Sequence, residues 1–170
     1  WGEETFDVII STQVLEHIDD LAGIIGDMKK LLSPEGMILI EVPDLERAEQ
    51  FLADTAFDFN YEHINFFTPR TLANAMLSNG FQSVGVSQHT VPFSQDYLSP
   101  MLCGAYKLSN VKESVVFDPS MPELGINYIR HCEDVINRLG GQVAGFLADR
   151  DQWVIWCTTS LTARLLAYGY

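Results

Sequence analysis

A short apolar run that ends in a polar turn constrains the fold of this chain more than any other feature. Residues Phe6–Ile10 are mostly apolar and rich in β-branched side chains, which predicts a strand buried on both faces of a parallel sheet. The polar residues Ser11, Thr12 and Gln13 follow this run directly. Open α/β sheets bind their ligands at the carboxyl ends of the strands. We therefore expect a binding site at this turn.

The next residues complete a β-α-β pattern. Asp19 or Asp20 can cap a helix, and its apolar residues recur at three- and four-residue spacing, namely at Ile18, Leu21, Ile25, Met28 and Leu32. Residues 33–36 end the helix, and Met37–Pro43 predicts a second strand. The expected fold class is α/β, with a Rossmann-like, doubly wound sheet in which this strand lies parallel to Phe6–Ile10 after a right-handed crossover.

Composition excludes several classes of protein. With 47% hydrophobic and 19% charged residues, the 170-residue chain can bury a core and is not disordered. It has no apolar run near the roughly 18 residues of a membrane span, and we expect no secretory leader. Its net charge of −13 argues against nucleic acid as a partner. Cys103, Cys132 and Cys157 have neither disulfide nor zinc spacing, which predicts a reducing, cytoplasmic location and no metal site.

Further elements follow along the chain. Asp44–Asp54 predicts a helix or an irregular segment, and a stretch dense in aromatic residues follows it. Thr68 and Pro69 predict the start of a helix that Asn79-Gly80 ends, and Phe81–Val86 alternates like a strand. A long helix is expected from Pro122, kinked or divided at Gly140-Gly141, with one apolar stripe through Ile129, Cys132, Ile136, Leu139, Val143 and Phe146 or Leu147. Gln152–Cys157 then predicts a buried strand, and Ser160 the start of a last helix.

Four phrases in this order, FDVI, VLEHI, LLSPEG and ILIEVP, resemble the second half of a class I S-adenosylmethionine (SAM)-dependent methyltransferase. The phrase from Tyr61 to Pro69, YEHINFFTP, is similar to that of the sugar C-methyltransferases, which act on nucleotide-linked keto sugars. This resemblance implies an enzyme that uses SAM and a small-molecule substrate, a nucleotide-sugar.

The resemblance covers only part of the family's fold. The family's glycine-rich SAM loop and ribose-binding acid lie upstream of its FDVI strand, so we expect a sheet that is incomplete at the N-terminus. On its own such a chain is expected to bind SAM weakly, to be inactive and to self-associate through an open sheet edge. The implied organisation is the second half of a methyltransferase domain at 1–90, a connector with one strand at 91–121, and the start of a C-terminal Rossmann-like α/β domain at 122–170. The turn Cys157–Ser160 lacks the family's glycine, which argues against phosphate binding there.

The resemblance assigns catalysis to the Tyr-Glu-His phrase. C-methylation beside a ketone needs a base that removes an α-proton and leaves an enolate, and an imidazole with a pKa near ~6.5 suits that transfer. His63 would be this base, and Glu62 would orient it or act as a second acid or base. Tyr61 and Asn60 would donate hydrogen bonds to the enolate oxygen. The alternative for His63 is a core histidine packed among the neighbouring phenylalanines.

The turn after the first strand supplies the candidate cofactor residues. Thr12, Gln13, Glu16 and His17 lie where methyltransferases hold the methionine part of SAM. Thr12 or Gln13 is expected to contact SAM through its backbone or side chain. Glu16 as a helix-entry residue and His17 as an ordinary loop histidine remain open alternatives.

Two other functions stay open at this point. One is an O- or N-methyltransferase acting on another small metabolite, which shares the first phrases but does not need the Glu-His pair. The other is a non-catalytic fragment that acts as a binding or scaffold module.

Overall fold

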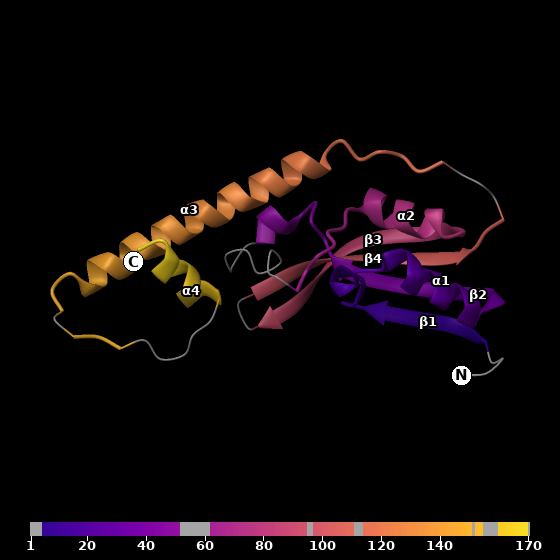
Figure 1. The fold of residues 1–170 in the computed structure, drawn as a ribbon, viewed down its shortest axis with the longest axis horizontal. Helices are drawn as coiled ribbons and strands as arrows, with labels where there is room; N and C mark the ends of the chain where they lie inside the picture. The colour runs from indigo at the N-terminus through magenta and orange to yellow at the C-terminus, as the bar shows by residue number, and fades with distance from the viewer. Residues whose placement is uncertain are drawn as a thin grey trace.

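The computed structural model describes residues 5–51, 62–94, 97–110, 114–150, 152–154 and 160–169. A body of strands and short helices occupies one side of the molecule, and a long helix leads away from it to the C-terminal helix (Figure 1). In chain order the elements are β1 (Phe6–Thr12), the 3₁₀ helix η1 (Leu15–His17), α1 (Leu21–Leu31), β2 (Leu32–Pro43), the 3₁₀ helix η2 (Ala48–Phe51), α2 (Pro69–Ser78), β3 (Phe81–Ser94), β4 (Tyr97–Leu108), α3 (Met121–Leu147) and α4 (Ser160–Ala167).

The four described strands form one mixed sheet in the order β1-β2-β4-β3. β1 and β2 are parallel, with Ile9 opposite Ile38, whereas β4 is antiparallel to both of its neighbours. α1 connects the parallel pair, and the Asp20 carboxylate accepts a hydrogen bond from the Gly23 amide at 2.9 Å to cap it. The predicted β-α-β unit and the α/β fold class are therefore confirmed.

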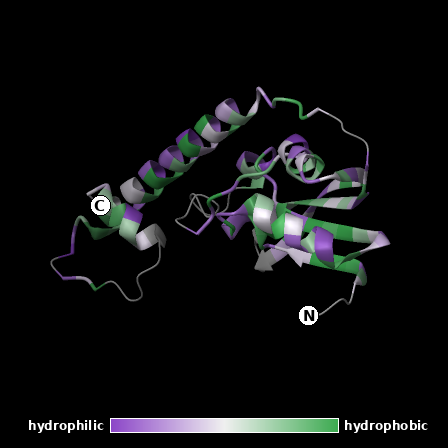
Figure 2. Cartoon of the chain, turned by 45° about the vertical axis from the view of Figure 1, so that its right-hand side comes forward, coloured by the Kyte–Doolittle hydropathy of each residue, from purple (hydrophilic) through white to green (hydrophobic). Residues whose placement is uncertain are grey.

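One face of the sheet carries the main core. Ile38, Ile40 and Val42 alternate along β2 and are fully buried, and they pack in one cluster with Ile25 of α1 and Leu72 of α2. Burying a side chain of this kind stabilises the fold by about 1.5–3 kcal/mol. Figure 2 shows the hydrophobic residues concentrated along the strands of this body.

The expectation that the first strand is buried on both faces is wrong. β1 lies at the edge of the described sheet, and Val8 and Ile10 on it are 54% and 66% exposed. Ile9, which points the other way, packs against the core cluster. The apolar run therefore predicted the strand correctly, but within the described residues only one of its faces is covered.

The segment expected to be a connector belongs largely to the sheet. β3 continues past Val86 to Ser94, and β4 pairs with both β2 and β3. Pro92 and Pro100 interrupted the sequence pattern, yet both lie toward the turn of the β3–β4 hairpin, where a missing amide costs few ladder bonds. Leu102 and Tyr106 farther along β4 are fully buried. The sheet thus extends beyond residue 90 to Leu108, and the strand expected between 91 and 121 is one of its inner strands.

The long helix α3 runs through Gly140 and Gly141 as one element of 27 residues, so it is not divided there. Its buried residues recur every fourth position, at Tyr128, Cys132, Ile136 and Gly140. The predicted stripe is therefore only partly correct, because Ile129 and Val143 are 46% and 37% exposed. None of the helices among the described residues is long and apolar enough to cross a membrane.

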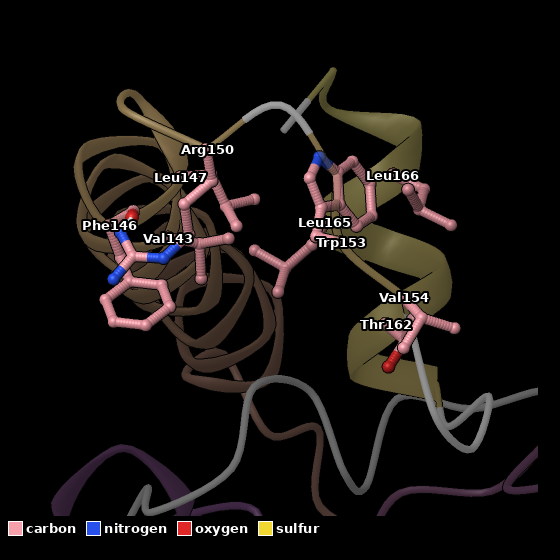
Figure 3. A pocket seen from close by; sticks show the side chains of 9 residues that line it. All are labelled: Val143, Phe146, Leu147, Arg150, Trp153, Val154, Thr162, Leu165 and Leu166. Carbon is pink, nitrogen blue, oxygen red and sulfur yellow. Dashed lines mark hydrogen bonds between the residues drawn. The ribbon is translucent and has the colours of Figure 1, made fainter.

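The predicted strand at Gln152–Cys157 is not found at 152–154, which have no regular structure, and its other residues lie outside the described ranges. Trp153 and Val154 are 54% and 83% exposed, so they are not buried as expected. The predicted last helix is present as α4. Side chains from the end of α3, from 152–154 and from α4 line an apolar pocket of about 320 Å³, to which Val143, Leu147, Trp153, Val154 and Leu165 contribute (Figure 3).

Candidate active site

The turn after β1 begins the candidate site. Thr12 and Gln13 are exposed at the carboxyl end of this strand, and the Gln13 amide donates a hydrogen bond to the Glu41 carbonyl at 2.8 Å. Gln13 has a φ of 52°, in the left-handed region that residues with a Cβ rarely adopt. Such a conformation costs on the order of 1–3 kcal/mol and is concentrated at functional sites. The chain then enters η1, where Leu15 and Glu16 are buried.

The segment that begins at Glu62 is held on this turn by hydrogen bonds. The backbone amides of Ile64 and Asn65 donate to the Glu16 carbonyl at 2.8 and 3.0 Å. The Asn65 side-chain amide donates to the carbonyls of Leu15 and Ile18 at 3.0 and 2.7 Å. Four bonds from two residues therefore fix the position of the neighbouring His63 relative to η1.

His63, His17 and Glu16 form a compact cluster as a result. The two imidazole rings lie edge to face, with centroids 4.7 Å apart and planes at 70°. The His17 Nε2 atom lies 3.8 Å from Oε1 of Glu16, and its Nδ1 atom lies 2.9 Å from the Glu62 carbonyl oxygen. Because that carbonyl can only accept, we assign the hydrogen to Nδ1 in the neutral ring. Glu16 is buried at 1% exposure, whereas the imidazole of His63 is half-buried.

The structure brings together some of the predicted site residues. His17, His63 and Glu16 meet at the carboxyl end of β1, close to Thr12 and Gln13 in the chain. Glu62 joins them through its carbonyl, and its side chain is exposed. Tyr61 and Asn60 lie outside the described residues. His63 is half-buried, and its ring contacts the ring of His17.

His63 also lines a small cavity that reaches the end of β2. The volume of this cavity is about 10 Å³, close to the minimum that holds one water molecule. The lining residues are Pro43, Asp44, Leu45, Ala48, His63, Asn65, Phe66 and Phe67.

Asp44 organises a polar network beside this cavity that the sequence did not reveal. Its carboxylate, 1% exposed, accepts hydrogen bonds from Arg47 Nε at 2.7 Å, Gln88 Nε2 at 3.0 Å and the Glu46 amide at 3.1 Å. Burial raises the pKa of Asp44, and the Arg47 hydrogen bond and charge oppose that rise. Arg47 also donates to the Met101 carbonyl at 3.2 Å. In the sequence, the i, i+3 spacing of Asp44 and Arg47 was the feature that indicated that these two side chains could pair. The network joins the carboxyl end of β2 to β3 and β4.

A second histidine–carboxylate pair lies elsewhere on the sheet. His89 Nε2 of β3 lies 3.0 Å from Oε2 of Glu41 on β2. No partner for His89 is apparent in the sequence, because the pairing crosses two antiparallel ladders. Both side chains are part-exposed, at 37% and 22%.

Comparison with known proteins relates the chain to methyltransferases. Residues 2–86 match a family described as a methyltransferase domain. The C-methyltransferase NovU of Streptomyces niveus is 30% identical over 82 residues, which are 46% of this chain and 18% of that protein.

Two solved structures are also similar. One is the 1,6-didemethyltoxoflavin-N1-methyltransferase of Burkholderia thailandensis, at 21% identity and a TM-score of 0.45, with 64% of this chain and 46% of that chain covered. The other is the CcbJ methyltransferase of Streptomyces caelestis, at 14% identity and a TM-score of 0.46, with 64% and 59% covered. The chain thus spans less than a fifth of the curated relative and about half of each structure.

Proposed function

Because this chain belongs to the methyltransferase-domain family, we propose that the whole protein transfers a methyl group from SAM to a carbon beside the ketone of a nucleotide-linked sugar. The family match confirms the predicted membership of the SAM-dependent methyltransferases. The sugar substrate and the residue roles are the proposal. The observation that carries it is the half-buried His63 held beside Glu16 and His17 at the carboxyl end of β1.

His63 is the proposed base. A ring nitrogen of its neutral imidazole takes the proton from the carbon next to the ketone, and the electron pair of that C–H bond forms the enolate. The four hydrogen bonds from Ile64 and Asn65 to backbone carbonyls of residues 15–18 keep the His63 backbone in place. Fixed placement of this kind lowers the entropic cost of the proton transfer. Tyr61 and Asn60 are proposed donors to the enolate oxygen, as the family resemblance implies.

Glu16 and His17 support this base from η1. The buried Glu16 carboxylate lies beside the His17 ring, with its Oε1 atom 3.8 Å from Nε2 of His17. We propose that His17 faces the methionine side of the SAM site and that Glu16 acts through His17. Glu62 contributes its carbonyl to the orientation of His17, and a role of its carboxylate as a second acid or base remains part of the proposal.

The turn after β1 fits one wall of a SAM site. Thr12 and Gln13 are exposed there, and the Gln13 amide is bonded to the neighbouring strand. SAM, when bound, supplies the electrophilic methyl group. Thr12 and Gln13 would hold its methionine part, in line with the ligand edge of open α/β sheets.

Hydrogen exchange on the substrate tests the proposed base directly. The whole protein is incubated in D₂O with a nucleotide-linked keto sugar and without SAM, and deuterium at the carbon beside the ketone is measured by mass spectrometry. Wild type is expected to exchange it, and His63→Asn to lose about 10²–10⁴-fold in this exchange and, in a parallel assay with SAM, in methylation. His131→Asn, on α3, is the matched control and should keep both. Equal exchange by wild type and His63→Asn would contradict the assignment.

The exchange assay and the parallel methylation assay together separate the rival functions. An O- or N-methyltransferase would methylate its acceptor without any carbon exchange, and a non-catalytic module would do neither. We also infer a cytoplasmic location, which the cysteine spacing supports because it matches no disulfide framework.

A further inference from the structure

We propose that Glu16, His17 and His63 together bind a divalent transition metal ion of the zinc type. Each of the three offers one ligand atom, and these atoms lie within 4.8 Å of one another. Two imidazoles and one carboxylate form a donor set that zinc accepts while one coordination position stays open to water. The ligands come from η1 and from a segment far along the chain, so the spacing of residues in the sequence predicted no metal site.

The orientation of His17 is that of a metal ligand. Its Nδ1 atom is bonded to the Glu62 carbonyl, and its Nε2 atom points toward the Glu16 carboxylate at 3.8 Å. Metal-bound histidines commonly donate their second ring N–H to a carbonyl in this way, which fixes the tautomer. In that tautomer Nε2 carries the lone pair that a metal ion would accept.

To bind zinc, the cluster must close by up to about 1.5 Å, because its three ligand atoms lie within 4.8 Å of one another. Ligand atoms of a tetrahedral zinc site with bonds of ~2.0–2.1 Å lie roughly 3.3 Å apart. The His17–Glu16 distance of 3.8 Å must therefore shorten by about half an ångström, which a side-chain rotation can supply. The His63 ring already lies against His17.

The backbone around the cluster is fixed before any ion binds. Asn65 donates to the carbonyls on both sides of Glu16, and two amides donate to the Glu16 carbonyl itself. The Glu16 carboxylate is 1% exposed, so its attraction for a bound cation is weakly screened by solvent. A preformed and partly buried site loses less free energy to ordering when it binds.

The Glu41–His89 pair provides the comparison. It has one imidazole and one carboxylate, already in direct contact at 3.0 Å. Among the described residues, the only group of three or more potential ligands that could hold an ion is the Glu16 cluster. We therefore expect Glu41 and His89 to contribute little to metal affinity, which makes His89 the matched control.

Metal binding has a consequence for catalysis that rests on the proposed function. An ion on His63 occupies a ring nitrogen that the proposed base needs. Zinc would therefore compete with α-proton removal. Binding of the ion itself does not depend on that proposal.

Calorimetric titration of Zn²⁺ into the metal-stripped chain at pH 7.5 tests the site, with Co²⁺ absorption as an independent readout of the ligand set. Wild type is expected to bind one equivalent at this site. Glu16→Gln and His17→Asn should each weaken binding at least ~10-fold, the lower end of the cost of losing even an outer partner of a metal ligand. His89→Asn should leave it unchanged.

Three results would overturn the site: no binding by wild type, unchanged affinity in both ligand variants, or loss of binding in His89→Asn. His17 is part-exposed, so its variant is expected to fold if the buried Glu16 variant does not, and circular dichroism checks both. If zinc binds through these ligands but does not inhibit proton exchange on a keto sugar, the metal site stands and the base role of His63 fails.

Discussion

Replacing Asn65 with alanine tests the hydrogen bonds that hold the His63 segment on η1. The substitution removes two side-chain bonds, to the carbonyls of Leu15 at 3.0 Å and Ile18 at 2.7 Å, and keeps the backbone bond to Glu16. A hydrogen bond within a protein contributes a net of about 0.5–1.5 kcal/mol. The free energy of unfolding should therefore fall by about 1–3 kcal/mol, and Tm by roughly 2–12 °C for a chain of this size.

Urea unfolding followed by circular dichroism measures this change. Asn74→Ala is the matched control, because Asn74 also makes two side-chain bonds, to the Val116 carbonyl at 2.6 Å and to its amide at 3.0 Å. These bonds are exposed, so water replaces them and the expected loss is smaller. If Asn65→Ala is no more destabilising than Asn74→Ala, the Asn65 bonds do not hold the site together.

Two further predictions concern pH and backbone conformation. Hydrogen bonds from Ser120 and Thr68 lower the pKa of Asp118 in the folded chain. The stabilisation that Asp118 provides is therefore complete above its unfolded pKa of ~3.9 and is lost as the pH falls through the lower folded pKa. Urea unfolding should show Asp118→Asn to be less stable than wild type at pH 7 and equal to it in strong acid. Gly80 ends α2 at a φ of +84°, so Gly80→Ala should lower the free energy of unfolding by about 1–2 kcal/mol. Gly26 lies inside α1 with open space around it, so Gly26→Ala should raise the free energy of unfolding by about 0.5–1 kcal/mol. Thermal melts of the two variants measure both changes.

The local elements were predictable where one pattern determines them. The spacing of apolar residues along 18–32 predicted α1, and Thr68 with Pro69 predicted the start of α2, where the Thr68 hydroxyl accepts a hydrogen bond from the Thr71 amide at 3.2 Å. Burial was less predictable, because it depends on partners that the local sequence does not specify. Val8 and Ile10 are apolar enough for a core, yet lie on a face that nothing among the described residues covers.

β4 and α3 also depend on partners that the local sequence does not specify. The prolines around residues 92–100 interrupted the sequence pattern that would have predicted β4. The position of β4 between β2 and β3 depends on its pairing with Ile38 and the neighbouring residues of β2, which lie far back in the chain. In α3 the sequence predicted the helix but placed its buried face at Ile129, whereas Tyr128 is the buried residue. The side that a helix buries is decided by its contact with η2 and the residues around Leu45.

The sequence predicted the two segments that form the site, but it did not predict that they contact each other. The resemblance identified His63, and the strand end identified His17 and Glu16, but nothing in either segment states that they meet. Their meeting depends on backbone donors at 64 and 65 that reach a backbone acceptor at Glu16. Backbone hydrogen bonds leave no residue signature. Asn65 was the available signal, since a half-buried amide side chain must find partners.

Glu62 has two roles to separate, one through its backbone carbonyl and one through its side-chain carboxylate. Its carbonyl orients His17 at 2.9 Å, and any residue at this position supplies a carbonyl. Its carboxylate is exposed, so it is accessible to a bound substrate. Glu62→Gln keeps the carbonyl and removes the charge. This variant should preserve zinc binding by the cluster even if it lowers methyl transfer. Loss of both zinc binding and methyl transfer would show that the Glu62 side chain, and not its backbone carbonyl, determines the orientation of the His17 ring.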